Sequence, residues 1–162
     1  VWKTVELGEF DGAPMFGTDP AGDGRYVFQT RDNAFLYGFG CYACSAAPLK
    51  ILTVENAEVK DVSTQSKFLA AHKAYLKDMI EDVPSEDVNG FLAGYVAEKI
   101  RLGEGKQAWD IMLAHYDKKS EWGLEICDRP LDDAGTCPGK VKLLSFPEAL
   151  ERMLNENGYK ID

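Results

Sequence analysis

The period of the hydrophobic pattern changes near residue 63, and this change constrains the fold more than any other feature of the sequence. Before it, short runs of alternating apolar and polar residues are separated by turn dipeptides such as Asp11-Gly12 and Asp23-Gly24. Such alternation is typical of half-buried β-strands. After it, apolar residues recur at helical spacing. The sequence therefore predicts an α+β fold with a β-rich half, residues 1–63, and a mainly helical half, residues 64–162.

The β-rich half is expected to form a small antiparallel β-meander packed against the helical half. Its links have hairpin length and are too short for the crossovers that parallel strands need. The expected strands cover residues 2–7, 25–30, 34–39, 48–54 and 58–62. In the strand at 34–39, three aromatic side chains would share one face, which in a strand is most often the core face: Phe35, Tyr37 and Phe39.

The helical half begins with a helix predicted over residues 64–82. His72 lies on its apolar stripe, and we expect a histidine at the edge of the core with one hydrogen-bond partner. Ser85 is a candidate N-cap for a second helix, in which Gly90 and Gly94 lie one turn apart and would allow close backbone approach. A third helix, with Trp109 on its apolar face, follows after a short link.

A strand is predicted at residues 140–144, and the last helix follows it directly. Ser145 and Glu148 form an S-x-x-E capping box with proline in the first turn, and Gly158 ends the helix. With 162 residues, the chain has the size of one ordinary domain, so we expect a single domain over 1–162.

The charge balance disfavours some partners. The chain has 27 acidic against 18 basic residues, a formal net charge of −9. Such a surface repels phosphate backbones and anionic lipid, so we expect no nucleic-acid partner. No apolar run approaches the roughly 18–20 residues of a membrane span, so none is expected. The acidic stretches could instead meet a protein partner.

Four cysteines occur in two close pairs, Cys41 with Cys44 and Cys127 with Cys137. An even number of paired cysteines favours an oxidising compartment. The chain begins at Val1, which fits a mature protein after removal of a signal peptide, or a trimmed chain. We therefore expect a periplasmic or extracellular protein.

Four cysteines allow three disulfide connectivities, of which we favour 41–44 with 127–137. The later pair flanks a loop rich in proline, aspartate and glycine that lacks a core of its own. In an extended strand, Cys41 and Cys44 would point to opposite faces, so a bond between them requires a turn at Tyr42-Ala43. A zinc site made of all four cysteines is another reading, although the later pair is widely spaced and neither pair has a histidine near it.

Residues 34–48 contain an apolar run, the C-x-x-C motif and Pro48, and this stretch resembles the active site of thioredoxin-like proteins. The resemblance implies a thiol–disulfide oxidoreductase that uses Cys41 and Cys44. That mechanism needs the first cysteine at a helix N-terminus, where a thiolate is stabilised. Here a strand is predicted after Cys44 and no βαβ unit precedes it, so this activity is the alternative.

The segment from Asp19 to Val27 resembles the calcium loop of FG-GAP repeats, whose D-x-D-x-D-G pattern precedes a strand. The resemblance covers at most residues 10–63 and implies Asp19 and Asp23 as calcium ligands. Ala21 replaces the middle ligand, and two carboxylates are too few for tight binding, so no metal is predicted. The chain as a whole also resembles uncharacterised secreted bacterial proteins with an FG-GAP-like N-terminal half and a helical C-terminal half.

Motifs of serine hydrolases, zinc proteases and phosphate-binding loops are absent from the sequence. We therefore favour an exported, disulfide-stabilised, non-catalytic protein that needs no cofactor and binds another macromolecule. The alternative is the thiol–disulfide oxidoreductase.

Overall fold

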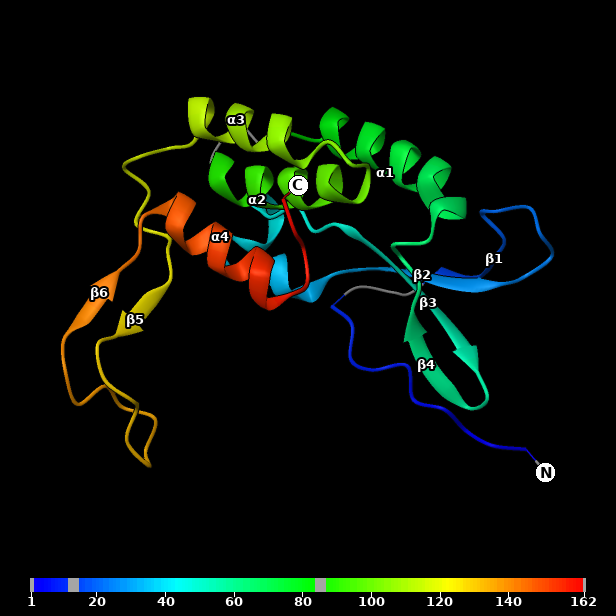
Figure 1. The fold of residues 1–162 in the computed structure, drawn as a ribbon, viewed down its shortest axis with the longest axis horizontal. Coiled ribbons are helices and arrows are strands. Elements are labelled where there is room, and N and C mark those ends of the chain that lie inside the picture. Colours follow the sequence, from blue (N-terminus) through cyan, green and yellow to red (C-terminus); the bar gives the residue numbers. More distant parts are fainter. Residues whose placement is uncertain (1, 12–14, 84–86, 162) are drawn as a thin grey trace.

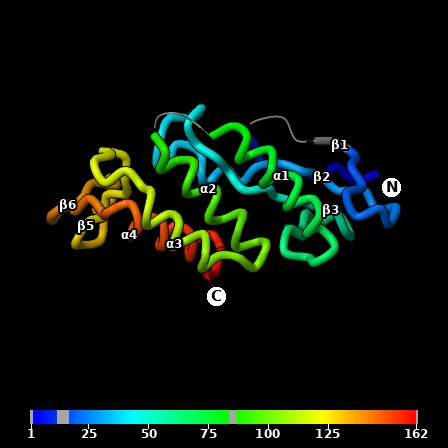
Figure 2. Tube along the Cα trace, turned by 90° about the horizontal axis from the view of Figure 1, so that it is seen from above, coloured from blue at the N-terminus to red at the C-terminus, as the bar shows by residue number. Residues whose placement is uncertain are grey.

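The computed structural model describes residues 2–11, 15–83 and 87–161 and has an α+β fold (Figure 1). A four-stranded sheet lies at one end, helices form the middle, and a two-stranded sheet lies at the other end. Figure 2, turned by 90°, shows the same order from end to end. The predicted fold class, an N-terminal β-meander with a helical C-terminal half, is confirmed.

The larger sheet is an antiparallel meander in the order β1-β2-β3-β4. Its strands are β1 (Met15–Thr18), β2 (Val27–Arg31), β3 (Leu49–Glu55) and β4 (Glu58–Asp61). Asn56 and Ala57 join β3 to β4, and both have positive φ angles, 55° and 65°. Two consecutive left-handed residues form the tight turn that matches the twist of a hairpin.

Two predicted strands are wrong. Residues 2–7 form no strand, and the Trp2 side chain is 99% exposed. Residues 34–39 form a 3₁₀ turn, Asn33–Phe35, and then further turns. Phe35 and Phe39 are buried against Tyr159 and Phe146, whereas Tyr37 has a φ of 61° and is 57% exposed. The three aromatic residues therefore do not share a face, because the chain turns between them.

The helices are α1 (Leu69–Glu81), α2 (Val88–Arg101), α3 (Gly105–His115) and α4 (Phe146–Glu156). α1 begins later than predicted because a 3₁₀ turn, Ser66–Phe68, precedes it. The predicted N-cap Ser85 lies outside the described residues. The capping box of α4 is confirmed, since the Ser145 N–H donates to the Glu148 carboxylate at 3.0 Å.

The smaller sheet is a hairpin of β5 (Glu125–Cys127) and β6 (Val141–Leu143), so the strand predicted at 140–144 is present. Figure 1 shows this hairpin extending away from the helices, at the end opposite β1–β4. Several apolar side chains in the hairpin and just before it are exposed, as on a surface element: Trp122, Leu124, Val141 and Leu143.

α2 is the most buried helix and organises the core. The main hydrophobic cluster gathers side chains of α2, α3 and α4 together with Phe35 and Phe39, and a smaller cluster lies between the sheet and α1. Gly90 and Gly94 on α2 face the segment that follows the C-x-x-C motif. A Cβ atom on Gly90 would lie 2.8 Å from the Cys44 carbonyl oxygen, and one on Gly94 would overlap the backbone of Ala46. The predicted close backbone approach is confirmed, and it fixes residues 44–46 on α2.

Candidate functional site: the Cys41–Cys44 turn and the adjoining cleft

Cys41 and Cys44 lie in a tight turn with their sulfur atoms at disulfide distance and their Cα atoms 5.0 Å apart. The turn at Tyr42-Ala43 that such a bond requires is a single 3₁₀ turn, Tyr42–Cys44. The backbone N–H of Cys44 donates to the Cys41 sulfur at 3.2 Å. The Ser45 hydroxyl donates to the Cys41 carbonyl oxygen at 2.9 Å. Both cysteines are partly exposed.

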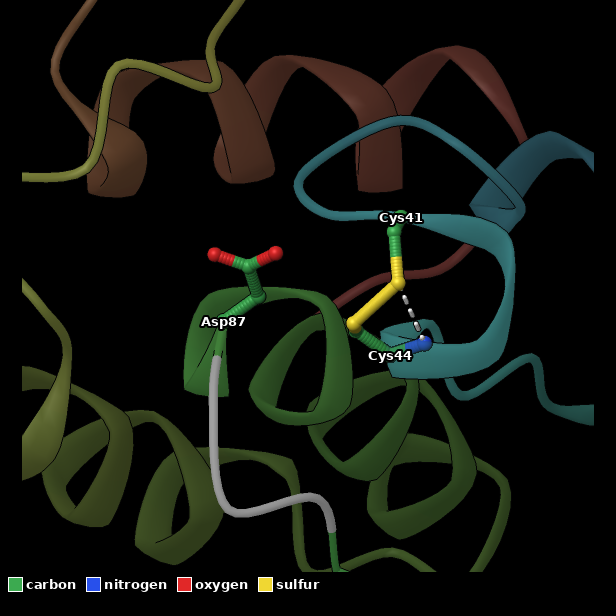
Figure 3. Close-up of side chains that lie close together, drawn as sticks. All are labelled: Cys41, Cys44 and Asp87. Carbon is green, nitrogen blue, oxygen red and sulfur yellow. Dashed lines mark hydrogen bonds between the residues drawn. A yellow bond between two sulfur atoms is a disulfide. The ribbon is translucent and has the colours of Figure 1, made fainter.

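Asp87 lies at the start of α2, beside the two sulfur atoms (Figure 3). Its carboxylate and the two sulfurs all lie within 4.8 Å of one another. Asp87 has a left-handed backbone, with φ at 52°, which aspartate tolerates better than most residues. A nearby carboxylate disfavours a second negative charge. This neighbour therefore opposes the thiolate that a thioredoxin-like mechanism would need.

A cleft of about 830 Å³ opens beside this turn. Residues 43–47 form one wall, α1 forms another, and the end of β2 closes the cleft. Its apolar lining includes five alanines and three larger side chains: Ala43, Ala46, Ala47, Ala71, Ala74, Leu49, Met79 and Phe91. Three carboxylates, Asp11, Asp78 and Asp82, line it against one cationic side chain, Arg31. The cleft is therefore apolar with an acidic rim.

Hydrogen bonds tie the walls of the cleft together. The Tyr75 hydroxyl on α1 donates to the Ala47 carbonyl oxygen at 2.8 Å. Burial raises the pKa of the Tyr75 phenol, so this hydroxyl keeps its proton at neutral pH. The backbone N–H of Leu49, also in the lining, donates to the Glu98 carboxylate at 2.8 Å.

Glu98 and His72 form a buried pair behind the cleft. Their side chains are 0% and 1% exposed, and His72 Nδ1 lies 2.6 Å from Glu98 Oε1. The His72 Nε2–H donates to the Ser63 carbonyl oxygen at 2.9 Å, since a carbonyl can only accept. One proton therefore lies between Nδ1 and Oε1. The prediction of a histidine at the edge of the core with one hydrogen-bond partner is wrong. His72 is fully buried and has two partners, Glu98 and Ser63.

Sequence reasoning missed Glu98. Buried glutamates are rare without a partner, and the partners here come from distant parts of the chain, at Leu49 and His72. One local signal was available. Residues 90–97 contain no charged residue on any side of the helix, which is the composition of a buried helix. Glu98 continues that helix directly.

Cys127 and Cys137 lie apart from this site, in the β5–β6 hairpin, at disulfide distance and with their Cα atoms 5.6 Å apart. Asp128 lies beside them. Among the described residues, no group of possible metal ligands contains cysteines from both pairs. The reading of one zinc site built from all four cysteines is therefore wrong, because the pairs occupy different parts of the fold.

Asp19 and Asp23 lie in the turn between β1 and β2. The Asp19 carboxylate accepts the N–H groups of Asp23 and Gly24, at 3.2 and 2.9 Å. The Asp23 carboxylate accepts the Arg25 N–H and pairs with Lys67 at 2.9 Å. The hydrogen bond from Lys67 and then that from Arg25 lower the pKa of Asp23. Both carboxylates thus help to hold the turn, and calcium binding by them is only what the FG-GAP resemblance implies.

A family model matches residues 71–158, which include most of α1, all of α2 to α4 and the β5–β6 hairpin. The chain belongs to the sll0997 C-terminal domain family. The match of the sll0997 family begins inside α1, so it does not test the FG-GAP resemblance of residues 10–63.

Two curated relatives support the assignment to the sll0997 family. A protein of Synechocystis sp., named "Probable thylakoid lumen protein sll0997", is 40% identical over 163 residues, which cover 98% of this chain and 48% of the relative. The "Uncharacterized protein y4bJ" of Sinorhizobium fredii is 37% identical, over 98% of this chain and 26% of the relative. The chain thus spans half or less of the length of these relatives. No solved structure matches.

The thylakoid lumen, for which the Synechocystis relative is named, is an extracytoplasmic compartment. Within the part of the chain that the structure describes, no helix combines the length and the hydrophobicity of a membrane span.

Proposed function

We propose that this member of the sll0997 family is an extracytoplasmic, disulfide-stabilised, non-catalytic domain that binds a basic segment of another protein in the cleft beside the Cys41–Cys44 turn. The observation that carries the proposal is the cleft itself, with its apolar lining and acidic rim. The lumenal relative and the cysteine pairs support an oxidising, exported location, either periplasmic, lumenal or extracellular.

The lining favours an extended segment with small or medium apolar side chains. Alanine side chains leave shallow space along both walls, and Met79 can adapt its shape to a ligand. Asp78 lies in the last turn of α1 and Asp82 is the C-cap residue of that helix, and both are exposed. They would attract lysine or arginine residues that flank the apolar part of the segment. The net charge of −9 would also increase the rate of encounter with a basic partner.

A second candidate function is thiol–disulfide exchange at Cys41 and Cys44. The N–H that Cys44 donates to the Cys41 sulfur, and the incomplete burial of both cysteines, favour it. The single 3₁₀ turn provides a much weaker helix dipole than a long helix, and Asp87 opposes a thiolate. Binding in the cleft is therefore the main proposal.

Fluorescence anisotropy with defined peptides would test the binding function. Two series of labelled peptides would share the same alanine, valine and leucine positions and differ only in carrying lysine or glutamate at the ends. We expect binding of the lysine series alone, weakened by salt. Asp78→Asn with Asp82→Asn should weaken it about tenfold, the equivalent of about 1.4 kcal/mol.

Glu121→Gln with Glu151→Gln is the matched control, because it removes the same charge from exposed positions outside the cleft. Ala74→Trp should fill the cleft and abolish binding. Equal binding of both peptide series, or unchanged binding by the Ala74→Trp protein, would contradict the proposal. Binding retained by Cys41→Ser with Cys44→Ser would separate this function from thiol exchange.

A further inference from the structure

We propose that Cys41, Cys44 and Asp87 form a binding site for a borderline-soft divalent metal ion, such as Zn²⁺, when the bond between the two cysteines is reduced. The proposal does not rest on peptide binding in the cleft. It rests on the way the fold brings a carboxylate from the start of α2 to a C-x-x-C turn.

The spacing of the donor atoms suits tetrahedral coordination. The two sulfurs and a carboxylate oxygen of Asp87 lie within 4.8 Å of one another. In a tetrahedral zinc site with Zn–S bonds of about 2.3 Å, two sulfurs lie about 3.8 Å apart. Reduction of the disulfide removes the S–S bond, and the sulfurs then need to separate by about 1.7 Å to reach that spacing. The Asp87 carboxylate lies beside both sulfurs, no more than 4.8 Å from either (Figure 3).

The surroundings leave Asp87 available as a ligand. Although it precedes α2, its side chain caps none of the described N–H groups of that helix. Gly40 lies against it: a Cβ atom there would be 3.3 Å from the Asp87 Cβ and 3.6 Å from the Cys44 Cβ. A larger residue at position 40 would therefore press against the side chains of both Asp87 and Cys44.

The Cys127–Cys137 pair offers a direct comparison. Asp128 lies beside that pair as Asp87 lies beside the first. However, the Asp128 carboxylate accepts the Lys140 N–H at 2.8 Å and so helps to hold the hairpin. Using Asp128 as a metal ligand would compete with that bond. We therefore expect the Cys41–Cys44–Asp87 group to bind metal more tightly.

Two further features favour a metal. The Cys44 N–H donates to the Cys41 sulfur and would stabilise its thiolate when it is a ligand. A bound cation would in turn neutralise the repulsion between the thiolates and Asp87. Three protein ligands would leave the fourth coordination position to water, as in open zinc sites.

The chemistry has two steps. A dithiol reductant transfers two electrons and two protons to the Cys41–Cys44 disulfide, which becomes two thiols while the reductant becomes a disulfide. The metal ion then replaces the thiol protons, and two protons are released to solvent. Bound metal would hold the thiols in the reduced form, so metal binding and disulfide formation are mutually exclusive.

The test uses the Cys127→Ser, Cys137→Ser protein, which retains only the first cysteine pair. It is reduced with dithiothreitol, freed of reductant without oxygen, and titrated with Cd²⁺, whose bonds to thiolate absorb in the ultraviolet. We expect one Cd²⁺ per chain, displaced by an excess of Zn²⁺, and none before reduction. Asp87→Asn should lower the affinity at least tenfold, whereas Asp87→Cys, which supplies a third sulfur, should raise it.

Glu58→Gln is the matched control, because it removes an exposed carboxylate on β4, in the sheet at the end of the molecule. Circular dichroism would verify that each protein is folded. Equal affinities for the parent and Asp87→Asn proteins would overturn the assignment of Asp87. Absence of stoichiometric binding by the folded, reduced protein would overturn the whole site.

Discussion

The hydroxyl group of Tyr159, near the C-terminal end of the chain, donates a 2.9 Å hydrogen bond to the buried carboxylate of Asp32. Asp32 directly precedes the 3₁₀ turn Asn33–Phe35. The Tyr159 ring packs edge-on against Phe35, and the Arg101 guanidinium lies 4.4 Å from its centre. Tyr159 therefore holds the C-terminal end of the chain against residues 32–35 of the N-terminal half.

Tyr159→Phe should lower the free energy of unfolding by about 1–3 kcal/mol, because it leaves the Asp32 carboxylate without this donor. Urea unfolding at pH 7 would measure the loss. Tyr26→Phe, at a side chain that is 69% exposed, is the control and should change little. A loss for Tyr159→Phe no larger than that of the control would refute the role of this bond.

Alkaline pH should destabilise the protein through the same tyrosine. Burial, and then the charge of Asp32, raise the pKa of Tyr159 far above its ordinary value. The folded chain thus holds this proton more tightly than the unfolded chain. Its contribution to stability is complete below a pH of about 10 and decreases as the pH rises above it.

Unfolding curves between pH 8 and about 11 would show this decrease. It should be smaller in the Tyr159→Phe protein, although not absent, because burial also raises the pKa of Tyr75. Identical pH dependence in the two proteins would contradict this explanation.

The buried pair of His72 and Glu98 predicts a sharp difference between two substitutions at one position. Glu98→Ala removes the acceptor of the Leu49 N–H and the partner of His72, and should cost about 3–5 kcal/mol. Glu98→Gln keeps an acceptor for Leu49 and a donor for His72 Nδ1, and should cost about 1 kcal/mol.

Chemical denaturation of both variants, and of His72→Ala alone and combined with Glu98→Ala, would measure the coupling between the two side chains. Glu58→Gln, on the exposed strand β4, is the control. Equal losses for Glu98→Ala and Glu98→Gln would show that the hydrogen bonds do not matter.

Gly94→Ala should destabilise the protein by about 1–3 kcal/mol, because the added methyl group would overlap the Ala46 backbone. In an exposed helix the same change stabilises by about 1 kcal/mol, so the expected sign is reversed. Thermal unfolding would decide. Gly90→Ala, against Cys44, should act in the same direction, and a rise in melting temperature for either variant would contradict the packing described here.

Removal of the second cysteine pair by Cys127→Ser with Cys137→Ser should have a local effect. The chain-entropy model gives about 2–3 kcal/mol for a bridge that closes so short a loop. The hairpin lies at one end of the molecule, so we expect faster amide exchange in residues 124–144 and unchanged exchange in α1 and α2. Faster exchange throughout would show that the hairpin stabilises the whole core.

Much of the fold could be predicted because local signals agree with the tertiary structure. The alternation of residues 48–54 and the capping box at Ser145 each act within a few residues. The failure at residues 34–39 has a physical cause. Aromatic residues at every second position resemble a strand, but Phe35 packs on Tyr159 and Phe39 packs on Phe146, and the chain turns between them.

The candidate site was only partly predictable. The Cys41–Cys44 motif is visible in the sequence, as is the need for a turn between the cysteines. Asp87 and Glu98 are not, because each acquires its role from a segment that is distant in the chain. Asp87 meets the two sulfurs, and Glu98 meets the Leu49 N–H, only after folding. No local sequence pattern predicts either contact.

The buried bond between Glu98 and Leu49 has a consequence for protein engineering. Glu98 lies within the matched region 71–158, whereas Leu49, which supplies one of its hydrogen bonds, lies outside it. A polypeptide that starts at residue 71 would keep the buried Glu98 carboxylate but would lack Leu49, which donates a hydrogen bond to it. A fusion protein that contains this family's domain should therefore start upstream of β2. It then keeps both β3, which contains Leu49, and α2, which contains Glu98.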